Sequence, residues 1–529
     1  MESKADFAEF SILRPPMAKS VLACWILTVL SSFIATHAEA ERGRPEAHQA
    51  IMLKNGVHLL LDDHFIARST GVERKVISPR RFLQKPIVTG APDHQNWQPF
   101  LTVLHDPAAS GNPFRMWYNV DVVDDPADGA FYGITGTLDS PDGLRWPGPY
   151  ERLRSLVDDG RVRFGANVLD DGPLHRPAAE RYKVLYFDAG KQVGPRIAFS
   201  SNGVNWTMHN GGKPILKANN GDDIWSAAYD PIRQRYFLFG KTYDPFSWTN
   251  AEGKKVSASI RRYYTSFSQD FKTWSAPKLV FSPDEKDAGI TQWYGPAGFL
   301  VRGDIIIAFL RVLRDDLSPE GAPPEAVAAN TKGSAGLGAS GFGLGGGSGM
   351  GYTVLAWTRD GETWQRDRHT DKFFEPDPRV GTWDHAMAWV GSSAAVGDDV
   401  HLYYAGYRWG HKYQHSVDRQ FGVVTLQRDR FVARLAGETV GTITTPSVIL
   451  TAEALTLNVD AKGGEVRVQV ATDDGEAIPG FRFQDCEPTT SDSLDAPVKW
   501  ARPLSMLKGR PIRLEFSLRN ARLFAYQTK

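Results

Sequence analysis

A short polar turn that ends in tryptophan recurs along the chain and limits what it can fold into. Its copies are SPDGLRW at 140–146, SNGVNW at 201–206, SQDFKTW at 268–274 and TRDGETW at 358–364. Each copy follows a segment with strand character, at 132–137, 196–200, 262–267 and 352–357. Asp or Asn followed by Gly favours a tight turn, because these residues tolerate positive φ. The motif therefore predicts a series of equivalent β-hairpins in which the Asp side chains are structural.

Four-stranded repeats can be placed around these hairpins. A very apolar strand precedes each hairpin strand, and we expect these second strands at 114–120, 181–187, 235–242, 305–312 and 400–407. Inner strands begin near Trp97, Phe164, Asp223, Trp293 and Asp384, 59 to 91 residues apart. The longest step contains a Gly-rich loop at 332–351, and a fifth repeat without Trp spans 420–432. This spacing predicts a five-bladed β-propeller, with a strand from 57–67 closing the ring.

The texture of the sequence changes after Gly437. Strand patterns at 455–459, 465–470, 511–518 and 522–526 alternate with turns rich in Gly and Asp. About ninety residues of this kind are typical of a β-sandwich. The expected organisation of this all-β chain is a signal peptide at 1–40, a propeller at 41–437 and a C-terminal β-sandwich at 438–529.

The first forty residues have the features of a secretory signal. Lys19 precedes the apolar run 21–30, and Ala38-Glu39-Ala40 fits a cleavage site with small residues. The run is too short for a membrane span. Cleavage would leave Cys486 as the one cysteine, so packing rather than disulfides must hold the fold. We expect a secreted or periplasmic protein with no membrane span.

Charge limits the classes of partner. Lys and Arg together number 61, as do Asp and Glu, so the formal net charge is zero. Nucleic-acid binding normally needs a basic face, which this balance does not favour. Aromatic residues make up 11% of the chain, including 15 Trp. Trp is a frequent core residue in β-proteins and also a stacking platform for sugars.

Several segments resemble a known clan of enzymes. They are 59–66 (LLLDDHFI), 115–118 (RMWY), the spaced hairpins, and the C-terminal pieces 480–481, 485–486, 497–500 and 518–523. With these segments the chain resembles the five-bladed glycoside hydrolase clan of families 32, 43, 62 and 68. It is most similar to the family-32-like secreted proteins of planctomycetes. The resemblance implies a propeller with a sandwich behind it and a poly- or oligosaccharide substrate.

The chain departs from that clan in its catalytic motifs. The Asn-Asp-Pro-Asn, Arg-Asp-Pro and Glu-Cys sequences that carry the three acids of family 32 are absent. Ligands of propellers bind where the inner strands converge, so we expect the site on those strands or their loops. Arg311, Arg314, Arg408 and His411 follow second strands and are candidates for its rim. The expected substrate-binding residues are Asp93, His94, Trp97, Asn167, Asp222, Trp225, Gln292, Trp293, Tyr294, Trp383 and His385.

Glycoside hydrolysis needs two carboxyl groups that face the same bond. Asp223 and Asp384 begin inner strands of different repeats and are the leading pair, with Asp63 third. No Glu lies on an inner strand, and Gln292 stands where one would be convenient. The sequence therefore predicts a secreted glycoside hydrolase whose general acid is unassigned.

Two other functions are compatible with the same residues. The missing Glu favours a non-catalytic carbohydrate-binding propeller. The hairpins are similar to those of sialidases, which need six blades, an Arg triad and a Tyr–Glu pair. We expect no cofactor and no metal site, although a structural calcium or sodium ion in the channel is compatible with the fold. The sequence does not indicate an oligomeric state.

Overall fold

A computed structural model shows that the chain is all-β, as predicted. It describes residues 50–88, 100–121, 133–148, 151–154, 163–188, 194–217, 225–249, 255–284, 286–287, 292–314, 316–324, 347–411 and 419–529. Besides strands, the elements in these residues include the 3-10 turns η2 (Ala178–Glu180), η3 (His209–Gly212), η4 (Phe483–Asp485) and η5 (Leu504–Leu507). The predicted signal peptide lies outside the described residues.

Three four-stranded antiparallel sheets follow one another along the chain, each with its strands in sequence order. Unit 1 contains β5 (Leu101–His105), β6 (Phe114–Asp121), β7 (Gly133–Ser140) and β8 (Glu151–Arg152). Unit 2 contains β9 (Arg163–Asp170), β10 (Tyr182–Asp188), β11 (Arg196–Ser200) and β12 (Thr207–Met208). Unit 3 contains β13 (Trp225–Asp230), β14 (Arg235–Thr249), β15 (Lys255–Ser268) and β16 (Lys278–Phe281).

Two further antiparallel units continue the series. Unit 4 contains β17 (Gln292–Arg302), β18 (Ile305–Arg314), β19 (Met350–Thr358) and β20 (Gln365–Arg366). Unit 5 contains β21 (Met387–Val396), β22 (Asp399–Tyr407) and β23 (Arg419–Gln427). A single parallel pairing, Gly351 with Met387, joins the two units into one seven-stranded sheet.

All five predicted second strands are present, as β6, β10, β14, β18 and β22. Among them β18 is strongly apolar, because side chains on both of its faces are covered. Every residue from Ile305 to Leu313 of β18 is buried, including Phe309.

The recurring turns are hairpins built on one hydrogen-bond pattern. In the first copy the Asp142 carboxylate accepts from the amides of Leu144 and Arg145, both at 2.9 Å. Ser140 accepts from the amide of Gly143, whose φ is +71°. Burial opposes ionisation of Asp142, but the backbone hydrogen bonds outweigh it and lower the pKa to about 2. The structural role predicted for these Asp residues is confirmed.

The segment that completes unit 5 is not the one we predicted. The amide of Arg80 donates to Thr425 at 2.7 Å, and that of Ile87 donates to Phe421 at 2.9 Å, both beside β23. Residues 57–67, expected here, instead begin with β2 (Gly56–Leu59), which pairs with β31 (Ala521–Thr528). Both segments have strand patterning, and the pairing partner, hundreds of residues away, is not encoded locally.

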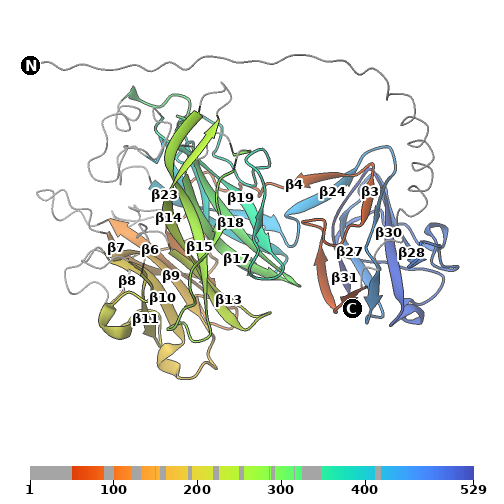
Figure 1. Cartoon of the computed structure of the whole chain (residues 1–529), viewed down its shortest axis with the longest axis horizontal. Coiled ribbons are helices and arrows are strands. Elements are labelled where there is room, and N and C mark those ends of the chain that lie inside the picture. Colours follow the sequence, from red (N-terminus) through yellow and green to blue (C-terminus); the bar gives the residue numbers. More distant parts are fainter. Residues whose placement is uncertain are drawn as a thin grey trace, which may run out of the picture. The chain divides into compact units, whose positions relative to one another are not determined.

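The C-terminal sandwich takes strands from both ends of the described chain (Figure 1, where red β3 and β4 lie among blue strands). One sheet has the order β1-β26-β30-β25-β3 with β28 on β30, and the other β29-β27-β31-β24-β4 with β2 on β31. Buried Leu514, Phe516 and Leu523 contribute to its core. The remaining bounds are β1 (Ile51–Leu53), β3 (Arg68–Thr70), β4 (Glu73–Val76), β24 (Val432–Ala436), β25 (Gly441–Thr444), β26 (Val448–Leu450), β27 (Leu455–Asp460), β28 (Glu465–Thr472), β29 (Asp492–Pro497) and β30 (Pro511–Arg519).

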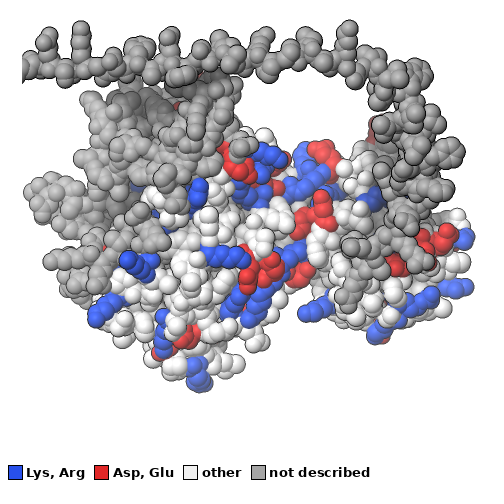
Figure 2. Space-filling model, in the orientation of Figure 1, with Lys and Arg blue, Asp and Glu red and all other residues white. Residues whose placement is uncertain are grey.

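The described surface carries mixed charge. Figure 2 shows Lys and Arg interspersed with Asp and Glu on the visible face, and neither sign forms a continuous stripe there. Within the described residues, no helix has the length and apolar character needed to cross a membrane.

Candidate functional site

The first strands of the five units, β5, β9, β13, β17 and β21, pack against one another in that order, and β21 also packs against β5. Polar side chains join them. Ser392 on β21 accepts from the amide of Val103 on β5 at 2.9 Å and donates to its carbonyl at 3.2 Å. Ser226 on β13 donates to the carbonyl of Pro296 on β17 at 2.6 Å. The first strands therefore form a closed series of contacts.

Asn167, predicted to bind substrate, is one of these joining residues. Its carbonyl oxygen accepts from the amide of Ala227 on β13 at 2.6 Å, and its amide group lies 3.5 Å from the Thr102 hydroxyl on β5. Asn167 thus connects three first strands. It also lines a small cavity of about 210 Å³ between the first strands, together with Gly298 and Ser392.

Polar and aromatic side chains gather where β13 and β17 begin. The β14–β15 hairpin (yellow-green in Figure 1) is longer than β13, because β13 begins at Trp225 opposite Gly240 while β14 continues to Thr249. In this extension Arg261 faces Tyr243 across the ladder and donates to its hydroxyl at 2.7 Å. The extension brings the Arg261 guanidinium over the ring of Tyr294 on β17, 4.0 Å from its centroid.

Tyr294 connects unit 3 to unit 5. Its hydroxyl and the Nε2 atom of His411, which follows β22, are 2.6 Å apart. Its ring stacks on Trp389 of β21 with centroids 4.3 Å apart. The predicted binding residue Tyr294 therefore lies at the centre of a buried group drawn from three units.

Arg311 of β18 completes the group. Its Nε donates to the carbonyl of Gly295 at 3.2 Å, and its guanidinium lies 6.0 Å from the ring of Phe100, which precedes β5. Burial lowers the pKa of Arg311 to about 10, so the guanidinium still carries its charge at neutral pH. We call Tyr243, Arg261, Tyr294, Arg311 and His411 the Arg–Tyr cluster.

Two predicted Trp residues lie at the starts of first strands but are covered. Trp225 is 2% exposed and packs edge-to-face on Tyr264, with centroids 6.0 Å apart. Trp293 is 1% exposed, with the Arg366 guanidinium 4.6 Å from its ring centroid. Gln292, beside it, is also buried. These side chains position the first strands and are not open platforms.

The three predicted residues before β21 are held by specific partners. Trp383 stacks on Tyr404 with centroids 5.4 Å apart. Tyr404 also donates to the Asp384 carboxylate at 2.8 Å, and Arg81 makes an ion pair with the same oxygen at 3.2 Å. Both ring nitrogens of His385 face backbone carbonyl oxygens, at 2.8 and 3.1 Å. The Asp384 carboxylate is thus bound by Arg81, which lies in the segment that completes unit 5.

Five predicted residues lie outside the described part of the chain, namely Asp93, His94, Trp97, Asp222 and Asp223. Asp223 stands two positions before Trp225, which places it next to the start of β13 in the chain.

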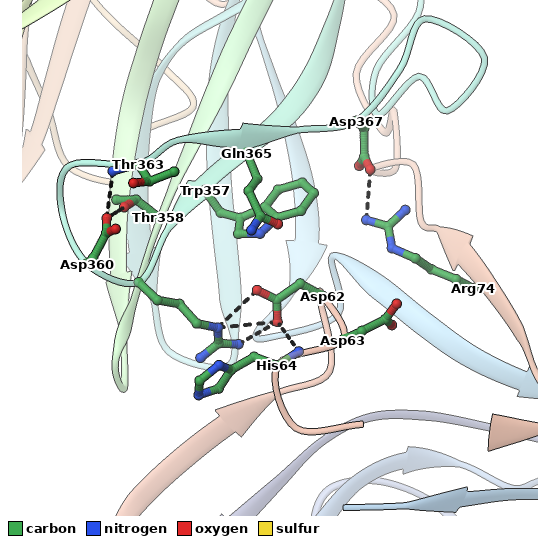
Figure 3. A pocket seen from close by; sticks show the side chains of 11 residues that line it. Asp62, Asp63, His64, Arg74, Trp357, Thr358, Asp360, Thr363, Gln365 and Asp367 are labelled. Atoms are coloured by element: carbon green, nitrogen blue, oxygen red, sulfur yellow. Dashed lines mark hydrogen bonds and ion pairs between the residues drawn. The ribbon is translucent and has the colours of Figure 1, made fainter. Parts of the chain in front are cut away.

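Asp63 lines a separate groove of about 640 Å³ between the loop after β2 and the β19–β20 hairpin (Figure 3). Its carboxylate makes an ion pair with Arg434 of β24 at 2.7 Å and is 75% exposed. Asp62, next to it, is bound by Arg359 at 2.8 Å. Asp63 therefore contacts the sandwich rather than a first strand, and the structure does not bring it to Asp384.

Another carboxyl group in the groove, that of Asp367, has a raised pKa. Asp367 is buried and makes an ion pair with Arg74 at 2.8 Å (Figure 3). Burial raises the pKa of Asp367 to about 6, because the positive charge of Arg74 offsets only part of the desolvation. For Asp62 burial acts in the same direction, but hydrogen bonds from Arg359 outweigh it and hold the pKa below its ordinary value.

Arg261 and Tyr243 are not among the residues predicted from the sequence, since Tyr243 lies on a second strand and Arg261 on a third strand rather than on an inner strand. The available signal was the pair Arg261–Arg262 inside a strand otherwise rich in apolar and aromatic residues. Charged residues at such positions are almost never buried without a partner or a role. Among the described residues no group of His, Cys, Asp and Glu has the arrangement of a metal site.

Comparison with known proteins finds only distant structural neighbours. No protein-family profile and no curated protein sequence matches the chain. One solved structure called a glycoside hydrolase is 15% identical, covers 66% of this chain and 92% of its own, and has a TM-score of 0.44. A glycosyl hydrolase from Bacteroides ovatus is 13% identical with a TM-score of 0.41, covering 72% and 97%.

A third structure is a protein reported with the GH130 family of mannoside phosphorylases, which contains glycoside hydrolases that target β-1,2-mannosidic linkages in Candida mannan. It is 13% identical with a TM-score of 0.39, covering 72% of this chain and 97% of its own. Since all three TM-scores are below 0.5, none of these likenesses assigns a function to this chain.

Proposed function

We propose that this chain is a secreted glycoside hydrolase on a five-bladed β-propeller, with its substrate bound at the Arg–Tyr cluster. The observation that carries the proposal is the convergence of side chains from three of the five units at this one place, with the residue before the first strand of unit 1 beside them. Arg261 comes from unit 3, Tyr294 and Arg311 from unit 4, and His411 from unit 5, while Phe100 leads into unit 1. Propeller ligands bind where first strands converge.

The five-bladed arrangement is supported by the contacts between units. Five first strands pack in sequence order, and β21 returns to β5. The segment with Arg80 and Ile87 then completes unit 5 from the N-terminal side. A sialidase-like arrangement would need a sixth unit in this series, and the described residues contain none between β21 and β5.

The chemistry of the cluster suits a sugar. Sugars present apolar ring faces and a fringe of hydroxyls, which aromatic side chains and charged hydrogen-bond donors complement. Tyr294 and Trp389 are the buried aromatic residues of this place, and Arg261 and His411 supply polar atoms. The same buried surroundings would strengthen every polar contact to a bound ligand.

Hydrolysis requires an acid that protonates the leaving oxygen and a carboxylate that acts as base or nucleophile. Asp223 is our first candidate, because it stands two positions before Trp225, the first residue of β13, in the sequence. Asp384 is the second, and it would have to exchange Arg81 for substrate before acting. Asp63 is the least favoured of the three, because its ion pair is with the sandwich.

One observation favours a non-catalytic carbohydrate-binding protein instead. The Asp384 carboxylate already accepts from both Tyr404 and Arg81, which is what a purely structural carboxylate does. In that case the chain would bind sugars at the cluster without turnover.

Reducing-end release from a panel of plant and algal polysaccharides separates the two functions. For a hydrolase we expect Asp223→Asn to lower kcat about 100-fold or more, since general acid–base groups typically contribute at least this much. Asp398→Asn, on an exposed turn, is the matched control and should leave kcat unchanged. Binding without turnover, or turnover that neither Asp223→Asn nor Asp384→Asn reduces, would contradict the hydrolase proposal.

A further inference from the structure

We infer that Arg261 is a recognition residue for an anionic group on the sugar, a carboxylate or a sulfate ester, so that the substrate is an acidic saccharide. This inference rests on the proposed function, because it names the substrate class of the same site. It comes from the state of the Arg261 side chain in the described structure.

Arg261 is buried without full hydrogen bonding. The residue is 6% exposed, and its Nη2 donates to the Tyr243 hydroxyl at 2.7 Å. Its Nε and Nη1 atoms are buried and have no hydrogen-bond partner in the described structure. Buried donors are nearly always satisfied in folded proteins, so two free ones on a single guanidinium need an explanation.

No carboxylate neutralises this guanidinium within the described residues. The groups that face Arg261 are the tyrosines Tyr243, Tyr263 and Tyr294 and a second cation, Arg311. Two other covered arginines in the described structure have acidic partners, Arg359 in Asp62 and Arg430 in Asp492. Arg261 has no such partner among the described residues, and its neighbour Arg311 adds positive charge.

Contacts with aromatic rings offset only part of the free-energy cost of burying the Arg261 guanidinium. The guanidinium lies 4.0 Å from the Tyr294 centroid and 5.3 Å from the Tyr243 centroid, both within cation–π range. A ring face satisfies neither Nε nor Nη1 as a hydrogen-bond donor. An anion placed there would accept hydrogen bonds from Nε and Nη1 and would also neutralise the guanidinium charge. Hydrogen bonds between charged groups are stronger than those between neutral groups.

The chemistry of the position selects the ligand. Arg is the side chain best suited to oxyanions, because its planar donors match carboxylate and sulfate oxygens and its charge does not titrate. Tyr294 and Trp389 are buried beside it and stacked on each other, so they form the aromatic wall next to Arg261 rather than an open platform. A neutral glycan would leave Arg261 uncompensated, whereas a uronate or sulfated residue would not.

The test compares binding of acidic and neutral oligosaccharides by the whole mature protein and two variants. Probes are oligogalacturonate, a sulfated galactan oligomer and a neutral arabinan oligomer, titrated calorimetrically at low and high salt. Arg261→Gln keeps hydrogen-bonding capacity and removes the charge. Arg145→Gln, on the first hairpin and 81% exposed, removes the same charge elsewhere and is the control.

We expect wild type to prefer one acidic probe over the neutral one by at least 10-fold, and Arg261→Gln to abolish that preference. Preference for the galacturonate identifies a carboxylate, and preference for the galactan identifies a sulfate. Without ligand, the Tm of Arg261→Gln should equal or exceed that of wild type, since an uncompensated buried charge is removed. A structural arginine would instead lower the Tm.

The inference is overturned if wild type prefers the neutral probe, or if Arg261→Gln retains the acidic preference. It is also overturned if Arg261→Gln melts well below both wild type and Arg145→Gln. Failure of the proposed function is a different result. If acidic sugars bind through Arg261 without turnover, the hydrolase proposal fails and the inference about Arg261 stands. If the protein hydrolyses a neutral glycan, the hydrolase proposal stands and the inference about Arg261 fails.

Discussion

Replacing Asp367 with Asn should change how stability depends on pH. Asp367 is buried in the groove, and its pKa rises from the ordinary 3.8 to about 6, mainly through desolvation. One pKa unit is worth 1.36 kcal/mol, so ionising this carboxyl in the folded state costs about 3 kcal/mol, as an upper value. Asn has similar size and cannot ionise, and Arg74 is 25% exposed and so can be hydrated in the variant.

The direction of the pH effect on stability follows from the number of protons that the folded and unfolded states bind. Between pH 3.8 and 6 the folded protein retains the Asp367 proton that the unfolded chain has lost, so stability falls as pH rises. Below pH 3.8 both states are protonated and this contribution to stability is fully present. Above pH 6 both are ionised and it has been lost. The Asp367→Asn variant should lack this decline.

Urea unfolding at pH 4, 5, 6 and 7.5 measures the effect. Relative to the variant, wild type should lose about 2–3 kcal/mol of unfolding free energy between pH 4 and 7.5. Asp398→Asn, which removes an exposed carboxyl, should parallel wild type across the range. Parallel curves for wild type and Asp367→Asn would refute the argument, because they would mean that burial does not perturb this carboxyl.

Three further predictions concern the fold, and urea unfolding measures each. Gly143→Ala should lower the free energy of unfolding by about 2–4 kcal/mol, because φ is +71° and the new Cβ would lie 2.4 Å from the Tyr403 hydroxyl. An unchanged free energy of unfolding would show that the hairpin rearranges freely. Ser392→Ala should cost about 1–2 kcal/mol through its two hydrogen bonds to Val103, and no loss would mean that β21 and β5 are held by packing alone. Asp142→Ala should cost about 1 kcal/mol at pH 7. Since the pKa of Asp142 is lowered to about 2, the difference should shrink as pH falls from 3.8 through 2, and a pH-independent difference would contradict the assignment.

Much of the fold could be predicted because its signals are local. The apolar run of β18 and the turn around Asp142 act within a few residues, so each can be read from the sequence. The same holds for the alternating pattern of β30, which is buried on one face. Repetition of such signals then indicated equivalent units in series.

The remaining features depend on contacts between distant segments. The segment that completes unit 5 contains Arg80, which forms an isolated bridge with Thr425, and its sequence does not identify this partner 345 residues away. Asp384 binds Arg81, 303 residues away in the chain, so the sequence around Asp384 does not reveal this ion pair. Arg261 was overlooked because an arginine on an outer strand is usually exposed, and only the extension of β14 and β15 brings it over Tyr294.

A crystal structure with a bound oligosaccharide tests the central claim most directly. The account predicts a sugar ring beside Tyr294 and Trp389, with an anionic substituent within hydrogen-bond distance of the Arg261 guanidinium. Density for the saccharide in the groove between Asp62 and Asp367, with the Arg–Tyr cluster unoccupied, would contradict it.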